Sequence, residues 1–395
     1  MDSLGKAVNL IVCQKSKIDD WVDHFRKYYA FVPEFVYNLS NKKELDMFFE
    51  HARCEESDVE NCYGIINYDL MWRRKELLEL NDFTLMLDES SLIQNMTAKR
   101  TKFILKMNPS NVILLSGTVC GGKYENLWSQ MHLLGWGISQ DTYNKQYVNW
   151  TLTKDDGSGI RHKIVDKDDP YKNVDRLKQK MREHGAVFMK TEDCFDLPEQ
   201  TFITVNCQSS KEYKRFKKES VIKIVTDSGD IELIGDTTLT KMMYSRMLCG
   251  QYNQEKLESF VELLESTNDR LIVFYNFNAE LDALKKIAGS MGKSISEVNG
   301  HTKDLDAYEH EENSVTFVQY QAGSMGLNLQ KANKIIYFTL PLMSEHFEQS
   351  KKRIHRIGQA NHCFYYLMIC KNTIEEDIYK TLEMRKDFTN ELFRE

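Results

Sequence analysis

The stretch QSKKRIHRIGQ, residues 349–359, says most about both the fold and the function of this chain. Its surroundings predict a helix. Ser344 suits the N-cap, and Glu345 and Glu348 suit the N-terminal part, because carboxylates are favoured near the positive end of the helix dipole. Gly358 suits the end of the helix.

Three polar side chains would share one face of this helix. Gln349, Arg353 and Arg356 are spaced i, i+4 and i+7, which places them on one side of an α-helix. Two guanidiniums on one face are costly unless an anion binds them, and arginine matches phosphate in a bidentate fork. The alternative is a solvated basic face, which is the usual outcome for a charge run.

The stretch resembles the last helicase motif of the superfamily-two ATPases. More narrowly, it is similar to the version found in Swi/Snf-type DNA translocases, roughly Q-A-x-x-R-x-H-R-I-G-Q, and the chain looks most like compact phage-encoded members. The resemblance implies that Arg353 and Arg356 reach across a cleft to the phosphates of ATP bound on the other lobe. It also assigns Gln349 and Gln359 to the nucleotide-coupled motif.

The composition is that of an ordinary globular protein. The chain has 395 residues, 42% of them hydrophobic and 28% charged, which is enough for two or three domains. No apolar run is long enough to span a membrane and no signal peptide is visible, so we expect no membrane partner. The nine cysteines include no C-x-x-C pair, which argues against a zinc site or disulfide framework and fits a reducing cytoplasm.

The net charge of −7 means that any surface for nucleic acid must be local. Each basic stretch of the sequence is a candidate, and each could equally be a solvated helix face. These stretches are Arg73–Lys75, Lys99–Lys102, Lys211–Lys218 and Lys351–Arg353.

Two early segments carry motifs that resemble the family's DNA-contacting ones. VNLIVC, residues 8–13, predicts a buried strand followed by an amphipathic helix. The loop between them resembles the family's second motif, which implies that Lys15 and Ser16 touch a DNA phosphate. GIINYDLMWRR, residues 64–74, reads as strand into helix, and the resemblance places Asn67 and Tyr68 along the DNA track. Tyr68 could equally be a core residue.

TLMLDESSLIQN, residues 84–95, is an apolar strand that ends in adjacent carboxylates, Asp88 and Glu89. At the carboxyl edge of a parallel sheet they would lie where ligands bind in open α/β folds. One carboxylate can hold Mg²⁺ and the other can activate the attacking water. The segment resembles the family's D-E-A-H…I-K-N box, with serines in place of Ala and His. The metal is therefore assigned to Asp88.

NVILLSGTVCGGKYENLW, the start of the segment 111–135, reads as strand, glycine loop and helix. Residues 117–123 fit G-x-x-x-x-G-K, but Tyr124 stands where the magnesium-binding hydroxyl should follow. The segment resembles more closely the family's S/T-G-T motif, which couples the ATP site to the DNA track through Ser116, Gly117 and Thr118. A phosphate-loop NTPase built on residues 117–123 remains the least favoured hypothesis.

The rest of the chain predicts a polar hairpin or loop, a helix, and then a second run of strands and helices. The expected segments are a loop at 151–170, a helix at 171–190, a strand at 197–207, helices at 209–218 and 239–266, a strand and helix at 270–288, a strand–loop–strand at 314–338 and a last helix at 373–392.

The loop QAGSMGLNL, residues 321–329, resembles the family motif A-G-G-x-G-L-N-L, with Ser324 where glycine is usual. Gly323 and Gly326 would let the backbone approach a phosphate or turn sharply. The resemblance adds Asn328 to the nucleotide-coupled residues.

The family's first motif, a strand, a G-x-x-x-x-G-K-[ST] loop and a helix, finds no match in these residues. Lys6 in Leu4-Gly5-Lys6-Ala7 imitates its end, but a strand follows at once. We therefore expect Met1–Lys6 to be the tail of the helix after such a loop, and a separate or upstream segment to carry the loop itself.

We predict an α/β protein with two RecA-like lobes and a cleft between them. Residues 1–195 would form the first lobe, N-terminally incomplete, and residues 196–395 the second. The resemblance implies an ATP- and Mg²⁺-dependent motor that moves on double-stranded DNA, impaired by itself. A non-catalytic DNA-binding or assembly module is the alternative.

Overall fold

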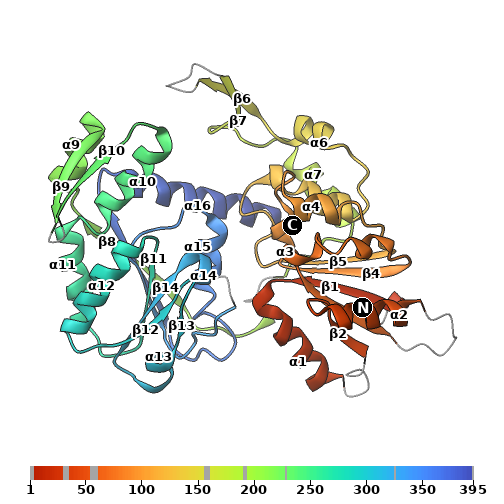
Figure 1. Ribbon diagram of the computed structural model, residues 1–395. Helices are drawn as coiled ribbons and strands as arrows, with labels where there is room; N and C mark the ends of the chain where they lie inside the picture. Colours follow the sequence, from red (N-terminus) through yellow and green to blue (C-terminus); the bar gives the residue numbers. More distant parts are fainter. Residues whose placement is uncertain are drawn as a thin grey trace. The chain divides into compact units, whose positions relative to one another are not determined.

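The computed structural model describes residues 4–29, 35–53, 61–154, 161–189, 194–226, 229–323 and 326–393. The chain divides into two compact units, Met1–Phe188 with Glu391–Glu395, and Met189–Asn390. Each unit contains its own sheet of mainly parallel strands flanked by helices (Figure 1), which confirms the predicted α/β class.

The sheet of the first unit has the order β2-β3-β1-β4-β5, and every pair is parallel. Its strands β1 and β3 are buried along their whole length, as expected for parallel strands covered on both faces. The strands are β1 (Val8–Cys13), β2 (Val36–Asn38), β3 (Cys62–Asn67), β4 (Phe83–Asp88) and β5 (Asn111–Leu115).

Short helices follow these strands. The α-helices are α1 (Ile18–Tyr28), α2 (Lys42–Ala52), α3 (Tyr68–Met71), α4 (Lys99–Ile104), α5 (Trp128–Leu133), α6 (Gln140–Tyr147) and α7 (Val174–Glu183). Between α6 and α7, strands β6 (Trp150–Lys154) and β7 (Arg161–Val165) form an antiparallel hairpin. Residues 155–160 at its turn lie outside the described ranges.

The sheet of the second unit has the order β13-β12-β14-β11-β15-β16-β8, and only the β12–β13 pair is antiparallel. Its strands are β8 (Gln200–Cys207), β11 (Leu271–Tyr275), β12 (Ser294–Val298), β13 (Lys303–Asp304), β14 (Ser314–Gln319), β15 (Lys334–Tyr337) and β16 (Cys363–Cys370).

The helices of the second unit differ from the prediction at 239–266 and around residues 349–359. They are α9 (Lys211–Glu219), α10 (Thr238–Cys249), α11 (Gln254–Glu265), α12 (Asn278–Ser290), α13 (Asp306–His310), α14 (Tyr320–Gly323), α15 (Ser344–Lys351) and α16 (Ile374–Phe393). The single helix predicted at 239–266 is wrong. Gly250 leaves the helical conformation, and the Asn253 side chain caps α11 by accepting from the Lys256 amide.

A hairpin that the sequence did not predict separates α9 from α10. Its strands are β9 (Val221–Thr226) and β10 (Gly229–Ile234). Ile222, Ile224 and Leu233 are buried in the core of the unit, while their neighbours along each strand are exposed, as expected for strands with one buried face.

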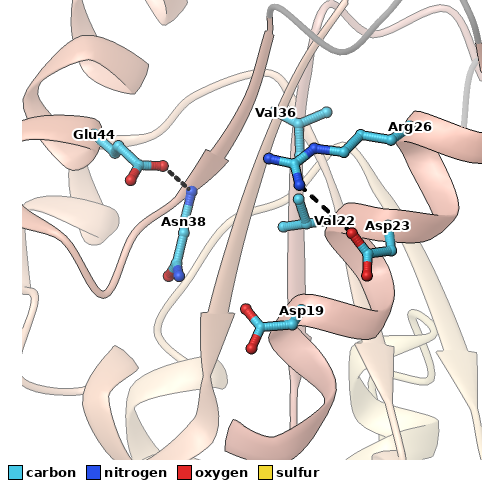
Figure 2. Close-up of a pocket in the computed structure, with 7 residues that line it drawn as sticks. All are labelled: Asp19, Val22, Asp23, Arg26, Val36, Asn38 and Glu44. Carbon is cyan, nitrogen blue, oxygen red and sulfur yellow. Dashed lines mark hydrogen bonds and ion pairs between the residues drawn. The ribbon is translucent and has the colours of Figure 1, made fainter.

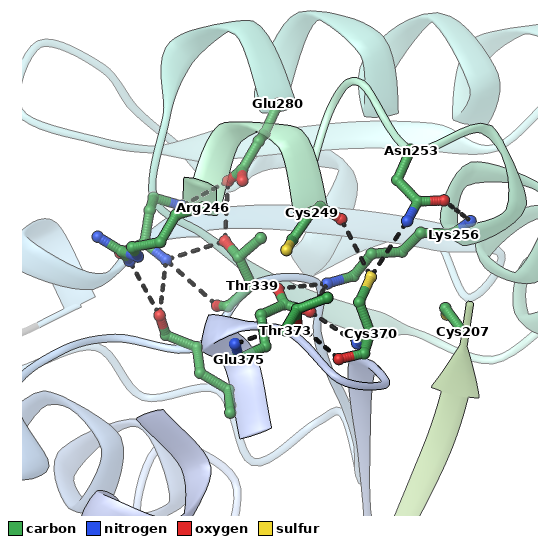
Figure 3. Close-up of polar contacts among 12 residues, drawn as sticks. Cys207, Arg246, Cys249, Asn253, Lys256, Glu280, Thr339, Cys370, Thr373 and Glu375 are labelled. Atoms are coloured by element: carbon green, nitrogen blue, oxygen red, sulfur yellow. Dashed lines mark hydrogen bonds and ion pairs between the residues drawn. The ribbon is translucent and has the colours of Figure 1, made fainter. Parts of the chain in front are cut away.

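A buried polar network joins α11 to β16 and α16 (Figure 3). The Lys256 ammonium donates to both carboxylate oxygens of Glu375, at 2.6 and 2.8 Å, and both side chains are inaccessible to solvent or nearly so. The Cys370 amide donates to the same carboxylate, and the Asn253 amide donates to the Cys370 sulfur. These bonds satisfy charges that would otherwise be costly to bury.

Within the described ranges, no helix combines the length and the apolar character that a membrane crossing requires.

Candidate functional site

The carboxyl edge of the first sheet collects motif residues from four neighbouring strands. Asn67 ends β3 and Asp88 ends β4, while Lys15 and Ser16 follow β1 and Ser116 follows β5. Because β3, β1, β4 and β5 are parallel neighbours, these positions meet at one edge. This edge is where open α/β sheets bind their ligands.

Asp88 is held in place by two aromatic side chains. The Trp21 indole donates to Asp88 Oδ2 at 3.0 Å, and the Tyr68 hydroxyl donates to the Asp88 carbonyl oxygen at 2.8 Å. Burial raises the pKa of Tyr68 well above its ordinary value, and the negative charge of Asp88 adds to the effect. The carboxylate is thus oriented, and its second oxygen is not used by Trp21.

The chain changes direction sharply at Glu89, which has φ 54° and ψ 56°. A non-glycine residue in the left-handed region costs free energy, and such residues are common at functional sites. Cys13, beside Asp88 at the end of β1, is buried, and burial together with the Asp88 charge raises the pKa of its thiol to about 12. The thiol is therefore neutral at pH 7.

Hydrogen bonds link the D-E-S-S segment to the loop after β5. Ser90 Oγ donates to the side-chain oxygen of Gln130, Oε1, at 2.9 Å, and Gln130 Nε2 donates to the backbone carbonyl of Val119 at 2.7 Å. Gln94 donates to the same carbonyl at 3.2 Å. Sequence reasoning assigned no role at the site to Gln130 or Trp21, because only the folded chain brings them to Ser90 and Asp88.

The S-G-T segment, residues 116–118, forms a tight turn directly after β5. The Thr118 amide donates to Ser116 Oγ at 3.2 Å, and Gly117 lies between them. Thr118 is buried, and its hydroxyl makes no hydrogen bond within the described part of the chain. A buried hydroxyl without a partner is a group that a ligand or water can satisfy.

The four proposed DNA-binding residues differ in their exposure to solvent. Lys15 and Ser16 are exposed, and Lys15 makes no ion pair with any described residue. Asn67 is buried and caps α3 by accepting from the Leu70 amide at 2.9 Å. Tyr68 is only 2% exposed, so its position is that of the core residue considered as the alternative.

Residues 117–123 do not form a strand–loop–helix of the phosphate-binding kind. Gly121 and Gly122 both have positive φ, but Lys123 leads into a short 3₁₀ turn with a buried Tyr124. The next α-helix begins only at Trp128. The segment therefore lacks the helix N-terminus that such a loop places against the phosphates.

The predicted helix around residues 349–359 is wrong in its extent. Helix α15 ends at Lys351, and Met343 rather than Ser344 is its N-cap. Gln349 is helical, but Arg353 and Arg356 lie in the turns that follow, so the three do not share a helical face. Gly358 has φ 94° within these turns.

These turns pack instead against the loop that contains Asn328. Arg356 donates to the Asn328 side-chain oxygen, and the Leu329 amide donates to the Arg353 carbonyl at 3.0 Å. Gln359 is buried and donates to the carbonyl of Ala332 at 2.8 Å. The structure therefore brings the G-L-N-L and R-I-G-Q segments together.

The glycines of this loop are partly described. Gly323 ends α14, and Gly326 has φ 69°, a conformation that favours glycine. Residues 324–325, including the Ser324 substitution, lie outside the described ranges.

Lys351 does not belong to a basic surface patch. Its ammonium is buried, bonds to Glu348 at 2.6 Å and lies 4.8 Å from the centre of the Phe347 ring. Burial lowers its pKa, and the Glu348 charge opposes that shift. The basic stretch 351–353 is therefore divided between core and surface.

A cavity in the first unit and a group of cysteine and carboxylate side chains in the second lie outside the motif segments. A cavity of about 380 Å³ between α1, β2 and α2 contains no motif residue (Figure 2), and it is lined by Asp19, Val22, Asp23, Arg26, Val36, Asn38 and Glu44. In the second unit, ligand atoms of Cys249, Cys370 and Glu375 lie within 4.8 Å of one another. Because Lys256 already neutralises Glu375, we assign no metal there.

Motif residues from four strands meet at the carboxyl edge of a parallel sheet, which is the arrangement of an open α/β protein. The family comparison is more specific. The model of the SNF2-related domain matches residues 4–256, and that of the helicase conserved C-terminal domain matches residues 255–358. The chain belongs to the SNF2-related family.

Known relatives are distant in sequence. The putative ATP-dependent helicase/translocase YwqA of Bacillus subtilis is 24% identical over 98% of this chain and 43% of its own length. The probable ATP-dependent DNA helicase CHR23 of Arabidopsis thaliana is 23% identical over 95% of this chain and 38% of its own. The chain thus spans about two fifths of these relatives.

Among solved structures, the C-terminal part of the Fun30 ATPase domain matches half of this chain and 98% of its own, with 14% identity and a TM-score of 0.37.

Proposed function

We propose that this chain is the motor part of an ATP-dependent translocase that acts on duplex DNA. The observation that carries the proposal is the convergence of four motif segments at one sheet edge, around Asp88. Membership of the SNF2-related family supports it, and so does the similarity to proteins named as ATP-dependent helicases. In this proposal residues 1–195 and 196–395 act as two RecA-like lobes.

Asp88 and Glu89 have the chemistry to serve nucleotide hydrolysis. Carboxylate oxygens are the ligands that Mg²⁺ prefers, and Trp21 uses only one of the two Asp88 oxygens, so the site fits that ion. The metal would neutralise charge on the ATP phosphates. Glu89 would orient the attacking water, and Ser116 and Thr118 would report the state of the site to the DNA-contacting segments.

The second unit would contribute Arg353 and Arg356. Guanidiniums stabilise charge on a transferring phosphoryl group, and an arginine of this kind accelerates hydrolysis by roughly three to five powers of ten. Asn328 would orient Arg356, since the two side chains are hydrogen-bonded. Gln349 and Gln359 would support the same loops.

The 395 residues of this sequence contain no G-x-x-x-x-G-K-[ST] motif. We therefore propose that these 395 residues hydrolyse ATP weakly by themselves and need a segment that supplies a phosphate loop. The same observation favours a second candidate, a DNA-binding module without turnover. Cytoplasmic location and a phage origin are further parts of the proposal that rest on the sequence alone.

ATP hydrolysis measured with and without duplex DNA tests the proposal. We expect slow turnover that DNA stimulates and that Asp88→Asn abolishes while DNA binding persists. Turnover that only Lys123→Ala abolishes would contradict it and favour the loop at 117–123. DNA binding without any turnover, even with a phosphate-loop segment supplied, would favour the non-catalytic module.

A further inference from the structure

Two basic stretches that are distant in the sequence meet at one indole ring in the first unit. The Arg73 guanidinium lies 5.1 Å from the centre of the Trp72 ring, and the Lys99 ammonium lies 4.8 Å from it. Trp72 directly follows α3, and Lys99 opens α4. We refer to Trp72, Arg73 and Lys99 as the Trp72 cluster.

The cluster is held by contacts between α3 and α4. Arg100, the neighbour of Lys99, bonds to the Asp69 carboxylate of α3 at 3.4 Å and to the Leu92 carbonyl at 2.9 Å. The cation–π contacts add to this attachment. The contacts between α3 and α4 therefore keep Arg73 and Lys99 close to each other.

Neither charge has a counter-ion in the described part of the chain. Arg73 and Lys99 are exposed and form no ion pair there, and Asp69 is already bonded to Arg100. Lys102, three residues after Lys99 on α4, is exposed and likewise makes no ion pair with a described residue. Like charges held together repel each other, so an anion between them would be stabilised.

The cluster also lies close to the proposed DNA-contacting residues. Asn67 caps α3, and only the four residues of α3 separate it from Trp72. In a chain with a net charge of −7, a group of unneutralised cations beside the carboxyl edge is a local exception.

We propose that the Trp72 cluster binds the phosphate backbone of duplex DNA, as a contact additional to Lys15 and Ser16. The inference rests on the proposed function, because that function supplies DNA as the partner. Arginine takes a phosphate in a bidentate fork and lysine adds a point charge, so the contact is independent of base sequence.

The salt dependence of DNA binding tests this inference. The probe is a mixed-sequence duplex oligonucleotide, and the variant is Arg73→Gln/Lys99→Gln in the full chain. Each lost phosphate contact lowers the slope of log affinity against log salt by about 0.9. Between 50 and 200 mM salt, the parent should therefore lose about tenfold more affinity than the double variant.

The matched control is Lys42→Gln/Lys43→Gln, which removes the same charge from exposed positions of α2, outside every candidate basic stretch. We expect this control to keep the parent slope, and both double variants to melt with the parent. A parental slope in Arg73→Gln/Lys99→Gln, or an equal fall in the control, overturns the inference and leaves the proposed function standing. A parent that binds no duplex at either salt concentration contradicts the proposed function itself.

Discussion

At the scale of single residues, Gly250 shows how tightly the second unit is packed. A Cβ at this position would lie 2.4 Å from Glu280 Oε1 and 3.2 Å from the Thr339 methyl group. Glu280 cannot move away cheaply, because it is fully buried and accepts bonds from the Asn276 amide and the Thr339 hydroxyl. We expect Gly250→Ala to lower the free energy of unfolding by about 1–3 kcal/mol in urea titrations.

Gly289 provides the opposite case. It lies in α12, and the nearest atom to a Cβ there would be Ile295 Cδ1 at 4.0 Å. Gly289→Ala should be neutral or stabilising by up to about 1 kcal/mol, because alanine favours a helix. Equal effects of the two substitutions would show that the packing around Gly250 is looser than described.

Glu280 makes stability depend on pH. Burial raises the pKa of its carboxyl above the ordinary 4.5, and the hydrogen bonds from the Asn276 and Phe277 amides only partly oppose this shift. The folded chain therefore holds the proton more tightly than the unfolded chain. The stabilisation is fully present below pH 4.5 and is lost as pH rises through the folded pKa.

The measurement is urea unfolding of the parent and of Glu280→Gln from pH 4 upward. As pH rises, we expect the free energy of unfolding of the parent to fall relative to that of Glu280→Gln, because only the parent must ionise a buried carboxyl. A difference independent of pH would mean that Glu280 ionises in the folded state as easily as in water.

The sequence indicated some residues of the candidate site but not those that hold them. The resemblance named Asp88 and Glu89, and the apolar strand before them explains why they end at the sheet edge. The roles of Trp21 and Gln130 were not predicted, because their hydrogen bonds to Asp88 and Ser90 depend on packing between segments distant in the sequence.

At the scale of elements, a buried ion pair between Lys256 of α11 and Glu375 of α16 links the two helices. Burial opposes the charge of Lys256, but the nearby Glu375 carboxylate outweighs burial and raises the pKa of Lys256, so the ammonium keeps its charge. Lys256→Met would leave a buried carboxylate without its cation, which costs about 3–5 kcal/mol. We expect a loss of that size in urea unfolding.

Two variants make the result specific. Lys286→Met changes an exposed lysine of α12 and should shift stability by no more than about 0.5 kcal/mol. Lys256→Met/Glu375→Leu removes both charges and should recover much of the loss. If the double variant is as unstable as Lys256→Met, packing rather than charge is responsible.

Elements were predictable where the local pattern was strong. The sequence predicts a strand at 8–13, a strand within 84–95 and a helix at 373–392, and the structure has β1, β4 and α16 there. The helix predicted through Gly358 ends at Lys351, and distant segments hold the turns that follow. The Tyr365 hydroxyl donates to the Lys351 carbonyl, and the Leu329 amide donates to the Arg353 carbonyl. No local signal in residues 344–358 contains that information.

At the scale of the whole molecule, the chain carries motif sets in both units. Asp88 belongs to the first unit and Arg356 to the second, and the SNF2-related and helicase C-terminal models together cover residues 4–358. We propose that residues of both units serve one DNA-stimulated hydrolysis of ATP. Replacing either Asp88 of the first unit or Arg356 of the second should therefore abolish that hydrolysis.

The most direct test is the rate of ATP hydrolysis with duplex DNA, in a chain joined before Leu4 to a strand–phosphate loop–helix segment. We predict DNA-stimulated turnover that falls by about three powers of ten or more in Arg356→Ala, with melting temperature and DNA binding near those of the parent. Lys352→Ala, the exposed control at the end of α15, should hydrolyse ATP like the parent. Normal hydrolysis by Arg356→Ala, or no DNA-stimulated hydrolysis by the joined chain, would contradict the account.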